Sequence, residues 1–337
     1  MTPEVSVVIP VYNGGAAFAD CLDALLASDH PRFEVIVVDD ASTDGSADTA
    51  AARGVVVISR ARRGGPSAAR NTGAARARGE VLVLLDADVV VQPTALSQAV
   101  AFLRGNPGVT GLSAIYAADS RARGFGSQYL NLKQRHFQLQ LPALPDTAWT
   151  AFFAIWREAF LACGGLDATM HHPAADDLVL GSRLAAAGHR LAFRRDIEVE
   201  HLKEVSVFGT WRFHHTHARE WSRASRRYRL LLPQKVQHSR RPVGNTLLAT
   251  GIVGVLLCGP AGVLLAPLPW AAALGGLGIA AVAWNAGFLR WMARERGWRF
   301  AARSLPVTLV EGLANASGLL AALAVPLPPS PEPGPTT

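Results

Sequence analysis

The stretch VLVLLDADVVV, residues 81–91, decides the fold that we predict for this chain. Its branched apolar residues predict a buried strand, yet Asp86 and Asp88 interrupt the run, and ionised carboxylates are costly to bury without a partner. Side chains alternate along a strand, so the two acids project to one side and can bind the same divalent cation. Mn²⁺ or Mg²⁺ prefers carboxylate oxygen and commonly shares its coordination with a diphosphate. An isolated D-x-D triplet also occurs in turns by chance, so the prediction depends on its surroundings.

Short β-rich runs alternate with helical stretches along the first 117 residues. Continuous apolar strands that alternate with helices are typical of a mostly parallel α/β sheet with helices on both faces. In such sheets, ligands bind outside the carboxyl ends of the strands. The predicted strands are 5–12, 33–40, 54–60, 80–88 and 108–117, and the predicted helices are 15–27, 45–53, 66–78 and 93–104.

Each of the first four strands ends in a polar sequence. These sequences are YNGG, DDASTDGS, RARRGGPSAARN and DAD. We expect them to converge on one edge of the sheet and to form a site for an anionic or metal-bound ligand.

Two further acids, Asp176 and Asp177, open a predicted helix in the sequence ADDLVLGSRLAAAGH. Acids at a helix N-terminus interact favourably with the helix dipole, which explains part of their placement without any function.

The motifs SVVIPVYNGG, VIVVDDASTDGS, GPSAARNTGAARARGEVLVLLDAD and ADDLVLGSRLAAAGH occur in that order. Together they closely resemble the family 2 glycosyltransferases, enzymes with the GT-A nucleotide-sugar-binding fold. The resemblance covers about residues 4–201 and implies an inverting transfer from an NDP-sugar. It also implies that Asp86 and Asp88 bind the donor through a divalent cation, Mn²⁺ or Mg²⁺.

The resemblance also implies roles for individual residues. Pro10, Tyr12 and Asp40 map to the nucleoside site, and Arg70 and Asn71 map beside the nucleotide and its phosphates. Asp177 maps to the catalytic base, which takes the proton from the acceptor hydroxyl. The family more often has Glu where Asp176 stands, and Val179 replaces an acid that is common there, so the acceptor-side contacts are less defined.

Several of these residues also have structural explanations. Asp44 is better explained as a helix cap, whereas Asp40 is not. Asp176 either lies on the acceptor side or only supports its neighbour. His201 resembles a histidine that adds a metal contact in some GT-A enzymes, although an isolated histidine is more often structural. Asp167, in the sequence GGLD, either contacts the acceptor or ends a turn.

The positive charge of the chain is concentrated in one segment. The formal net charge is +7, and residues 206–243 alone carry nine Lys or Arg and one Glu. The basic character is therefore local and does not indicate nucleic-acid binding. Residues 206–232 predict a basic amphipathic helix with Trp211, Trp221 and Tyr228 on its apolar side, which favours a position on an anionic membrane surface.

The C-terminal third predicts a membrane region. Residues 244–289 contain no charged residue, and 305–327 contain only Glu311, which we place at a shallow depth. A span needs about 20 apolar residues, so we predict three, at about 246–266, 269–289 and 305–326. The basic sequences RRPVG and RWMARERGWRFAARS predict cytoplasmic loops, and the N-terminus does not resemble a signal peptide. The three cysteines show no ligand spacing and suggest neither a disulfide framework nor a zinc site.

The predicted organisation is a catalytic domain at 1–205, an interfacial segment at 206–243, a membrane region at 244–327 and a disordered Pro-rich tail at 328–337. We therefore expect a multi-pass protein of the cytoplasmic membrane whose catalytic domain is cytoplasmic and whose acceptor is lipid-linked or membrane-associated. The alternatives are a polyprenyl-phosphate glycosyltransferase, which the intact Asp177 disfavours, and a non-catalytic scaffold. A processive polysaccharide synthase is disfavoured because the sequence HAREW (217–221) does not match the Q-x-x-R-W element of those enzymes. A dinucleotide-dependent oxidoreductase is disfavoured because no G-x-G-x-x-G follows the first strand.

Overall fold

A computed structural model describes residues 2–145, 147–170, 174–228 and 240–324. The chain divides into two compact units. Unit 1 comprises Met1–Arg123 and Lys133–Glu204, and unit 2 comprises Gly124–Leu132 and Val205–Thr337. The predicted tail, 328–337, lies outside the described residues.

Unit 1 is built on one eight-stranded sheet with the order β3-β2-β1-β4-β7-β6-β8-β5. The four strands β3, β2, β1 and β4 pair in parallel, as the sequence predicts. The strands are β1 (Val5–Val11), β2 (Phe33–Asp39), β3 (Val56–Ser59), β4 (Val81–Leu85), β5 (Val89–Val91), β6 (Gly111–Tyr116), β7 (Phe152–Trp156) and β8 (Leu191–His201).

The other half of the sheet is mixed. β7 pairs antiparallel with both β4 and β6, and β5 pairs antiparallel with β8. The run VLVLLDADVVV is therefore two strands, because Asp86 to Asp88 turn the chain from β4 to β5. This division places both acids in the connection between a central strand and an edge strand.

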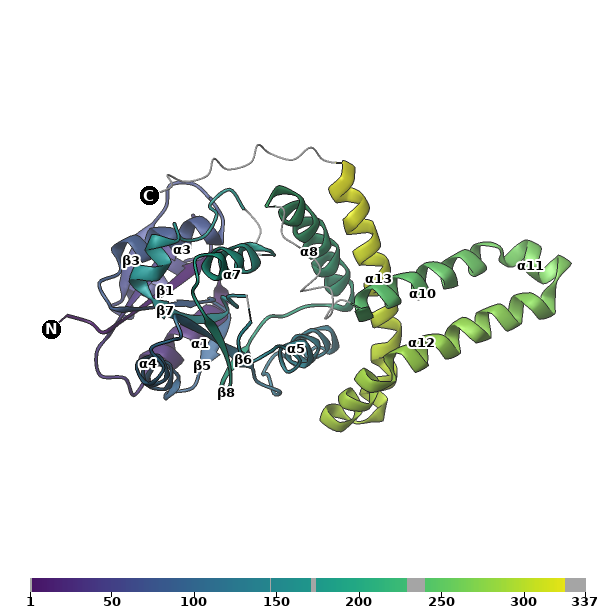
Figure 1. The fold of residues 1–337 in the computed structure, drawn as a ribbon, viewed down its shortest axis with the longest axis horizontal. Coiled ribbons are helices and arrows are strands. Elements are labelled where there is room, and N and C mark those ends of the chain that lie inside the picture. The colour runs from purple at the N-terminus through teal and green to yellow at the C-terminus, as the bar shows by residue number, and fades with distance from the viewer. Residues whose placement is uncertain (1, 146, 171–173, 229–239, 325–337) are drawn as a thin grey trace. The chain divides into compact units, whose positions relative to one another are not determined.

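Helices cover both faces of the sheet, as predicted (Figure 1). One face packs against α1 (Gly15–Leu26) and α4 (Ala95–Gly105), and the other against α3 (Pro66–Arg76), α6 (Arg157–Ala162) and α7 (Asp176–Ala186). α2 (Ser46–Ala51) follows β2, and α5 (Phe125–Gln138) begins in unit 2 and ends in unit 1. The two apolar cores fix the central strands, so the strand ends have defined positions.

Unit 2 is helical. After the first half of α5 it contains α8 (Val207–Arg227), α10 (Arg240–Leu257), α11 (Gly259–Leu265), α12 (Pro267–Arg296) and α13 (Trp298–Ala324). Among the described residues, two helices are long and apolar enough to cross a membrane, namely α12 and α13. The sequence predicts three long spans, but only two such helices are found among the described residues. The first predicted span is divided between α10 and α11 at Cys258.

Candidate active site

The loops after the first two strands are tied to each other at the edge of the sheet. Asn13 Oδ1 accepts a hydrogen bond from the Thr43 backbone N–H at 2.8 Å, and Asp44 Oδ2 accepts one from Gly15 N–H at 3.0 Å. Asp44 Oδ1 also accepts from the Ser46 N–H at the start of α2, at 3.0 Å. Asp44 therefore stabilises the beginnings of two helices, in line with the capping role predicted for it.

Asp40, predicted at the nucleoside site, is buried and holds the next loop. Its carboxylate accepts hydrogen bonds from Arg60 Nη1 at 2.8 Å, from Gly64 N–H at 2.9 Å and from Gly65 N–H at 2.7 Å. These bonds fix the segment that leads into α3. A nucleoside beside Asp40 would meet a carboxylate whose two oxygens already order this loop.

The start of α3 places Arg70 beneath the edge of the sheet. Gly65, with a φ of 89°, precedes Pro66 at the first turn, and glycine is the residue that adopts this φ without strain. One turn after Arg70, a Cβ on Gly73 would lie 2.4 Å from Val8 Cγ1, so this position requires glycine for α3 to lie close to β1. The close approach explains how the Arg70 side chain comes to be buried below the strand ends.

Arg70 connects the two acidic motifs of the sequence. Its Nη2 donates to Asp86 Oδ1, and its Nη1 donates to Asp176 Oδ2 at 3.0 Å. Ser67, one turn earlier on α3, donates to the same Asp176 oxygen at 3.1 Å. A single guanidinium therefore holds the D-x-D acid after β4 and the first acid of α7 in a fixed relation.

Burial and charge act in opposite directions in this cluster. Burial alone would lower the pKa of Arg70, but the charges of Asp86 and Asp176 raise it above its usual value. For Asp86, burial dominates and raises the pKa, although the guanidinium of Arg70 opposes the shift. Arg70 therefore stays charged and is the main partner of a carboxylate that the protein has partly desolvated.

Asp88 has a different partner from Asp86. Its Oδ2 lies 3.4 Å from His201 Nε2, at the end of β8. Burial would raise the pKa of Asp88, but His201 and then Lys203 lower it to about 2. The acid is therefore ionised at neutral pH, and about a third of its side chain remains exposed.

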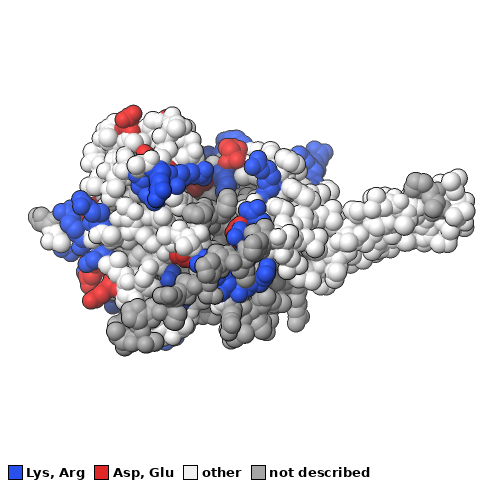
Figure 2. All heavy atoms as spheres, turned by 90° about the horizontal axis from the view of Figure 1, so that it is seen from above, with Lys and Arg blue, Asp and Glu red and all other residues white. Residues whose placement is uncertain are grey.

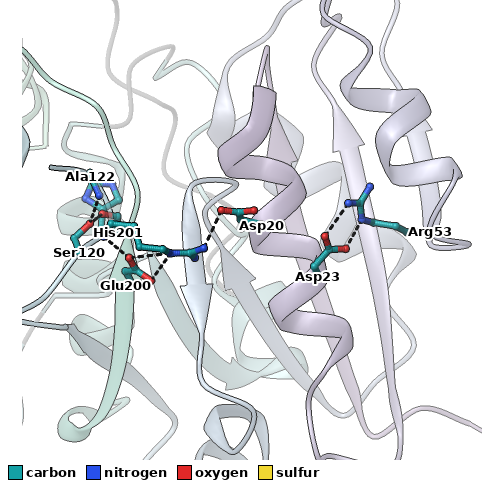
Figure 3. Close-up of polar contacts among 8 residues, drawn as sticks. Asp20, Asp23, Arg53, Ser120, Ala122, Glu200 and His201 are labelled. Carbon is teal, nitrogen blue, oxygen red and sulfur yellow. Dashed lines mark hydrogen bonds and ion pairs between the residues drawn. The ribbon is translucent and has the colours of Figure 1, made fainter. Parts of the chain in front are cut away.

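His201 is held through its ring and through its backbone. It stacks on the Tyr116 ring with the centroids 4.7 Å apart and the planes 4° from parallel. Ser120 Oγ donates to the His201 carbonyl at 2.7 Å, and Glu200, the preceding residue, joins a polar network that extends to Asp20 on α1 (Figure 3). His201 therefore has a defined position at the border of the site.

The Asp88 and His201 side chains fit a divalent cation as a two-ligand pair. Carboxylate oxygen and imidazole nitrogen are suitable donors for Mn²⁺, and a partly exposed carboxylate leaves positions for substrate oxygens and water. Among the described residues, no three His, Cys, Asp or Glu side chains gather closely enough to hold a metal by themselves. Asp86, predicted as a second metal ligand, is bonded to Arg70.

Asp177, the predicted base, lies in the first turn of α7 and is partly exposed, whereas its neighbour Asp176 is buried. Its Oδ1 accepts from the Leu178 N–H at 2.7 Å. Asp176 supports the helix start through Arg70 and Ser67. The two adjacent acids therefore have different surroundings, and only Asp177 is open to a ligand on that side.

Asn71, predicted beside the nucleotide, is hydrogen-bonded to the loop 164–167. Its Nδ2 donates to Leu166 C=O at 2.7 Å, and its Oδ1 accepts from Leu166 N–H at 2.9 Å. Arg183 Nη2 donates to the Gly165 carbonyl of the same loop. Asp167 Oδ1 accepts from Thr169 N–H at 2.9 Å, which is the turn-ending contact considered above.

The two remaining nucleoside candidates belong to β1 or follow it. Pro10 lies within the strand, opposite Val38 of β2. Tyr12 is exposed, and the Arg63 guanidinium lies 3.9 Å from the centre of its ring. An exposed aromatic ring beside a cation at the strand end is a suitable surface for a nucleobase.

Sequence reasoning missed Ser67 and Tyr116, which support Asp176 and His201 respectively. Ser67 could have been identified from the sequence, because it lies one turn before Arg70 on a predicted helix. Tyr116 contacts His201 across 85 positions of the sequence, and no local pattern predicts such a contact.

Comparison with solved structures identifies the class of fold. The mannosyltransferase PcManGT from Pyrobaculum calidifontis, solved in complex with GDP-Man and Mn²⁺, superimposes with a TM-score of 0.58 at 21% identity, over 94% of this chain and 88% of that chain. At this level of identity the match shows the fold alone, which is the GT-A fold.

The sequence comparisons point to one family. Residues 6–163 match the model described as "Glycosyl transferase family 2", so this part of the chain resembles that family. The glycosyltransferase GlyG of Streptococcus pneumoniae is 34% identical over 97 residues, 27% of this chain and 32% of that protein. The poly(ribitol-phosphate) beta-glucosyltransferase of Bacillus spizizenii is 40% identical over 101 residues, 28% of this chain and 16% of that protein. The chain thus covers a third or less of these relatives.

Proposed function

We propose that this protein is an inverting glycosyltransferase that moves a sugar from an NDP-sugar to a hydroxyl of a membrane-associated, lipid-linked acceptor. The observation that carries the proposal is the Arg70 bridge between Asp86 and Asp176. It keeps the D-x-D turn, where the donor phosphates would bind, next to the start of α7, where Asp177 is partly exposed. A family 2 domain with this arrangement has the groups that a displacement at an anomeric carbon needs.

The donor would lie across the carboxyl ends of β1, β2 and β4. Tyr12 would contact the base, and the loop fixed by Asp40 would border the nucleoside. Asp88 and His201 would hold a divalent cation, which neutralises the charge of the departing nucleoside diphosphate. Arg70, already paired with two acids, would position the site and would not carry the phosphates itself.

Asp177 would act as the general base. As the acceptor hydroxyl attacks the anomeric carbon, its proton passes to the carboxylate, the new glycosidic bond forms and the bond to the nucleoside diphosphate breaks. Attack from the face opposite the leaving group inverts the configuration. Asn71 and Arg183 fix the loop 164–167 on the acceptor side, so Asp167 would border the acceptor without taking part in the chemistry.

We place the acceptor at the membrane because unit 2 combines two apolar helices with the basic helix α8. A cation-rich helix next to apolar helices is suited to an anionic membrane surface. The protein would thus be anchored in the cytoplasmic membrane with unit 1 on the cytoplasmic side, the side on which nucleotide sugars are made.

The test uses the full-length protein in detergent. Purified protein would be screened with UDP-, GDP- and TDP-sugars and Mn²⁺ for protection against thermal unfolding and for release of the nucleoside diphosphate. We expect protection by one donor group, dependent on the metal, and turnover that Asp177→Asn removes. Absence of turnover with every donor, together with no effect of Asp177→Asn, would refute the enzyme assignment and leave a scaffold. Turnover with polyprenyl phosphate that survives Asp177→Asn would instead indicate an acceptor that is already ionised.

A further inference from the structure

The apolar helices of unit 2 are not equivalent. α10 and α11 run from the base to the tip of a projecting hairpin, α12 returns, and α13 passes across the base (Figure 1). Figure 2 shows the hairpin without a blue or red atom, in agreement with the absence of charge from residues 244–289. The two halves of unit 2 therefore present very different surfaces to a membrane.

The hairpin is held together along its length by specific contacts. Near the base, Asn285 Nδ2 donates to Asn245 Oδ1 at 2.8 Å. Nearer the tip, Trp270 Nε1 donates to the Val255 carbonyl at 2.8 Å. Contacts between residues of ascending number on α10 and descending number on α12 define an antiparallel pair, so the hairpin is a single structural element.

The length and surface of the hairpin match a lipid bilayer. The limb 268–289 is about 33 Å of continuous apolar helix at 1.5 Å per residue, against a hydrocarbon thickness of about 30 Å, and the limb 244–265 has the same number of residues divided between α10 and α11. The side chains at and near the tip are strongly exposed, with Leu264, Leu265 and Leu268 all above four-fifths of full exposure. Exposed leucines on this scale have no favourable surroundings in water.

α13 has a polar neighbour over its C-terminal half. His214 Nε2 of α8 lies 2.6 Å from Glu311 Oε1, and about three turns later Arg226 Nη1 donates to the Ala322 carbonyl at 3.0 Å. Between them, a Cβ on Gly318 would lie 2.3 Å from the His215 carbonyl oxygen, so the two backbones are in close contact. The helices α8 and α13 therefore run parallel and side by side.

This pairing is incompatible with α13 as an isolated span. If α13 crossed the hydrocarbon, α8 would cross beside it with Arg212, Arg219, Arg223, Arg226 and Arg227. Arginine is among the residues least tolerated at the centre of a bilayer. At the membrane surface the same pair is favourable, because Leu319, Leu320 and Leu323 are exposed on α13 and the arginines can meet headgroups.

We propose that residues 244–289 enter the bilayer as a helical hairpin, and that α13 lies with α8 along the membrane surface and does not cross. The occupant of the exposed hairpin surface is then the acyl-chain region of the lipid. The end of α13 and the end of α8 lie on the same side of the membrane, opposite the tip of the hairpin. The proposal concerns membrane topology and does not depend on the proposed enzymatic activity.

The test is labelling of single cysteines in membrane vesicles with a charged, impermeant maleimide. In a background with all three native cysteines replaced (Cys21→Ala, Cys163→Ala, Cys258→Ala), Leu265→Cys reports the tip, Leu323→Cys the end of α13, and Phe208→Cys the start of α8. We expect Leu323→Cys and Phe208→Cys to react from one face and Leu265→Cys from the opposite face. Reaction of Leu323→Cys from the face that labels Leu265→Cys overturns the proposal, and so does reaction of all three from one face. Labelling in detergent verifies that each thiol is reactive.

A matched pair of arginine substitutions gives a second readout. Ile279 on α12 and Leu320 on α13 are both strongly exposed. We expect Ile279→Arg to lower the amount of protein recovered in carbonate-washed membranes at least tenfold and Leu320→Arg to leave it within twofold. Equal losses for the two variants would place α13 in hydrocarbon, and no loss for either would place the hairpin outside it; both results overturn the proposal.

Discussion

Two buried charges, Arg70 in unit 1 and Glu311 in unit 2, are each held by two partners, but the resulting clusters differ in what they can do. The partners of Arg70 are Asp86 and Asp176, and the Asp86 side chain keeps 30% of its exposure. Glu311 is 2% exposed. It accepts a hydrogen bond from the Tyr129 hydroxyl at 2.9 Å and pairs with His214.

The difference lies in the elements that supply the partners. Around Arg70 they come from a strand exit and a helix start, and one of them, Asp86, stays partly exposed. Around Glu311 they come from α5 and α8, which pack against α13 along their sides and enclose the acid. We infer that the first cluster organises a site and that the second joins helices. The following four predictions test this distinction.

The largest effect is expected for Asp177→Asn. The substitution keeps the shape of the side chain and removes the base, so transfer should fall about 10²- to 10⁴-fold. Donor binding, measured by thermal protection, should be unchanged. The control is Asp167→Asn, since the Asp167 carboxylate is bonded to its own turn; it should change kcat less than tenfold. Similar losses for the two variants would mean that the base has been assigned to the wrong acid.

The next largest effect is expected for Arg70→Gln. Removing one partner of a buried ion pair leaves carboxylates without compensation, which costs about 3–5 kcal/mol of unfolding free energy. Denaturant unfolding of the full chain in detergent measures the loss. Arg53→Gln is the control, because Arg53 pairs with Asp23 at the surface (Figure 3) and this change should have little effect. Equal stability of the two variants would contradict the central position of Arg70.

The parallel half of the fold could be predicted from the sequence because its strands are local features. The strands ending at Val11, Asp39 and Leu85 are mostly apolar and are followed by turn residues, so the sequence indicates where each strand ends. The pairing of β7 and β8 could not be predicted in this way, because it depends on contacts with strands far away in the sequence. β5 is too short to be distinguished from the run that precedes it.

The candidate site shows the same limit. The sequence supplied the acids Asp86, Asp88, Asp176 and Asp177, since paired carboxylates at element ends are conspicuous. It did not supply their partners. That Asp86 is bonded to Arg70 and Asp88 to His201 follows from the three-dimensional convergence of β4, α3 and β8, which no local pattern encodes.

A smaller effect is expected for His201→Gln. If the Asp88–His201 pair holds the cation, losing the imidazole should raise the Mn²⁺ concentration for half-maximal activity at least tenfold, with kcat at saturating metal less affected. Metal titration of donor hydrolysis measures the shift. Glu200→Gln is the control, because Glu200 is the next residue and pairs with Arg121. A shift that is the same in both variants would point to a disturbance of the β8 end and not to a lost ligand.

The smallest effect is expected for Glu311→Gln, and it separates the two clusters most directly. The amide oxygen of glutamine can still accept from the Tyr129 hydroxyl, so the variant loses only the charge that faces His214. One charge-assisted hydrogen bond exchanged for a neutral one corresponds to about 1 kcal/mol of stability. Thermal inactivation in detergent should therefore occur slightly earlier, whereas the affinity for the nucleotide sugar should stay within twofold. A change of more than twofold in the affinity for the nucleotide sugar would show that the Glu311 cluster is energetically coupled to the site. The distinction between a charge that forms the site and a charge that joins helices would then no longer hold.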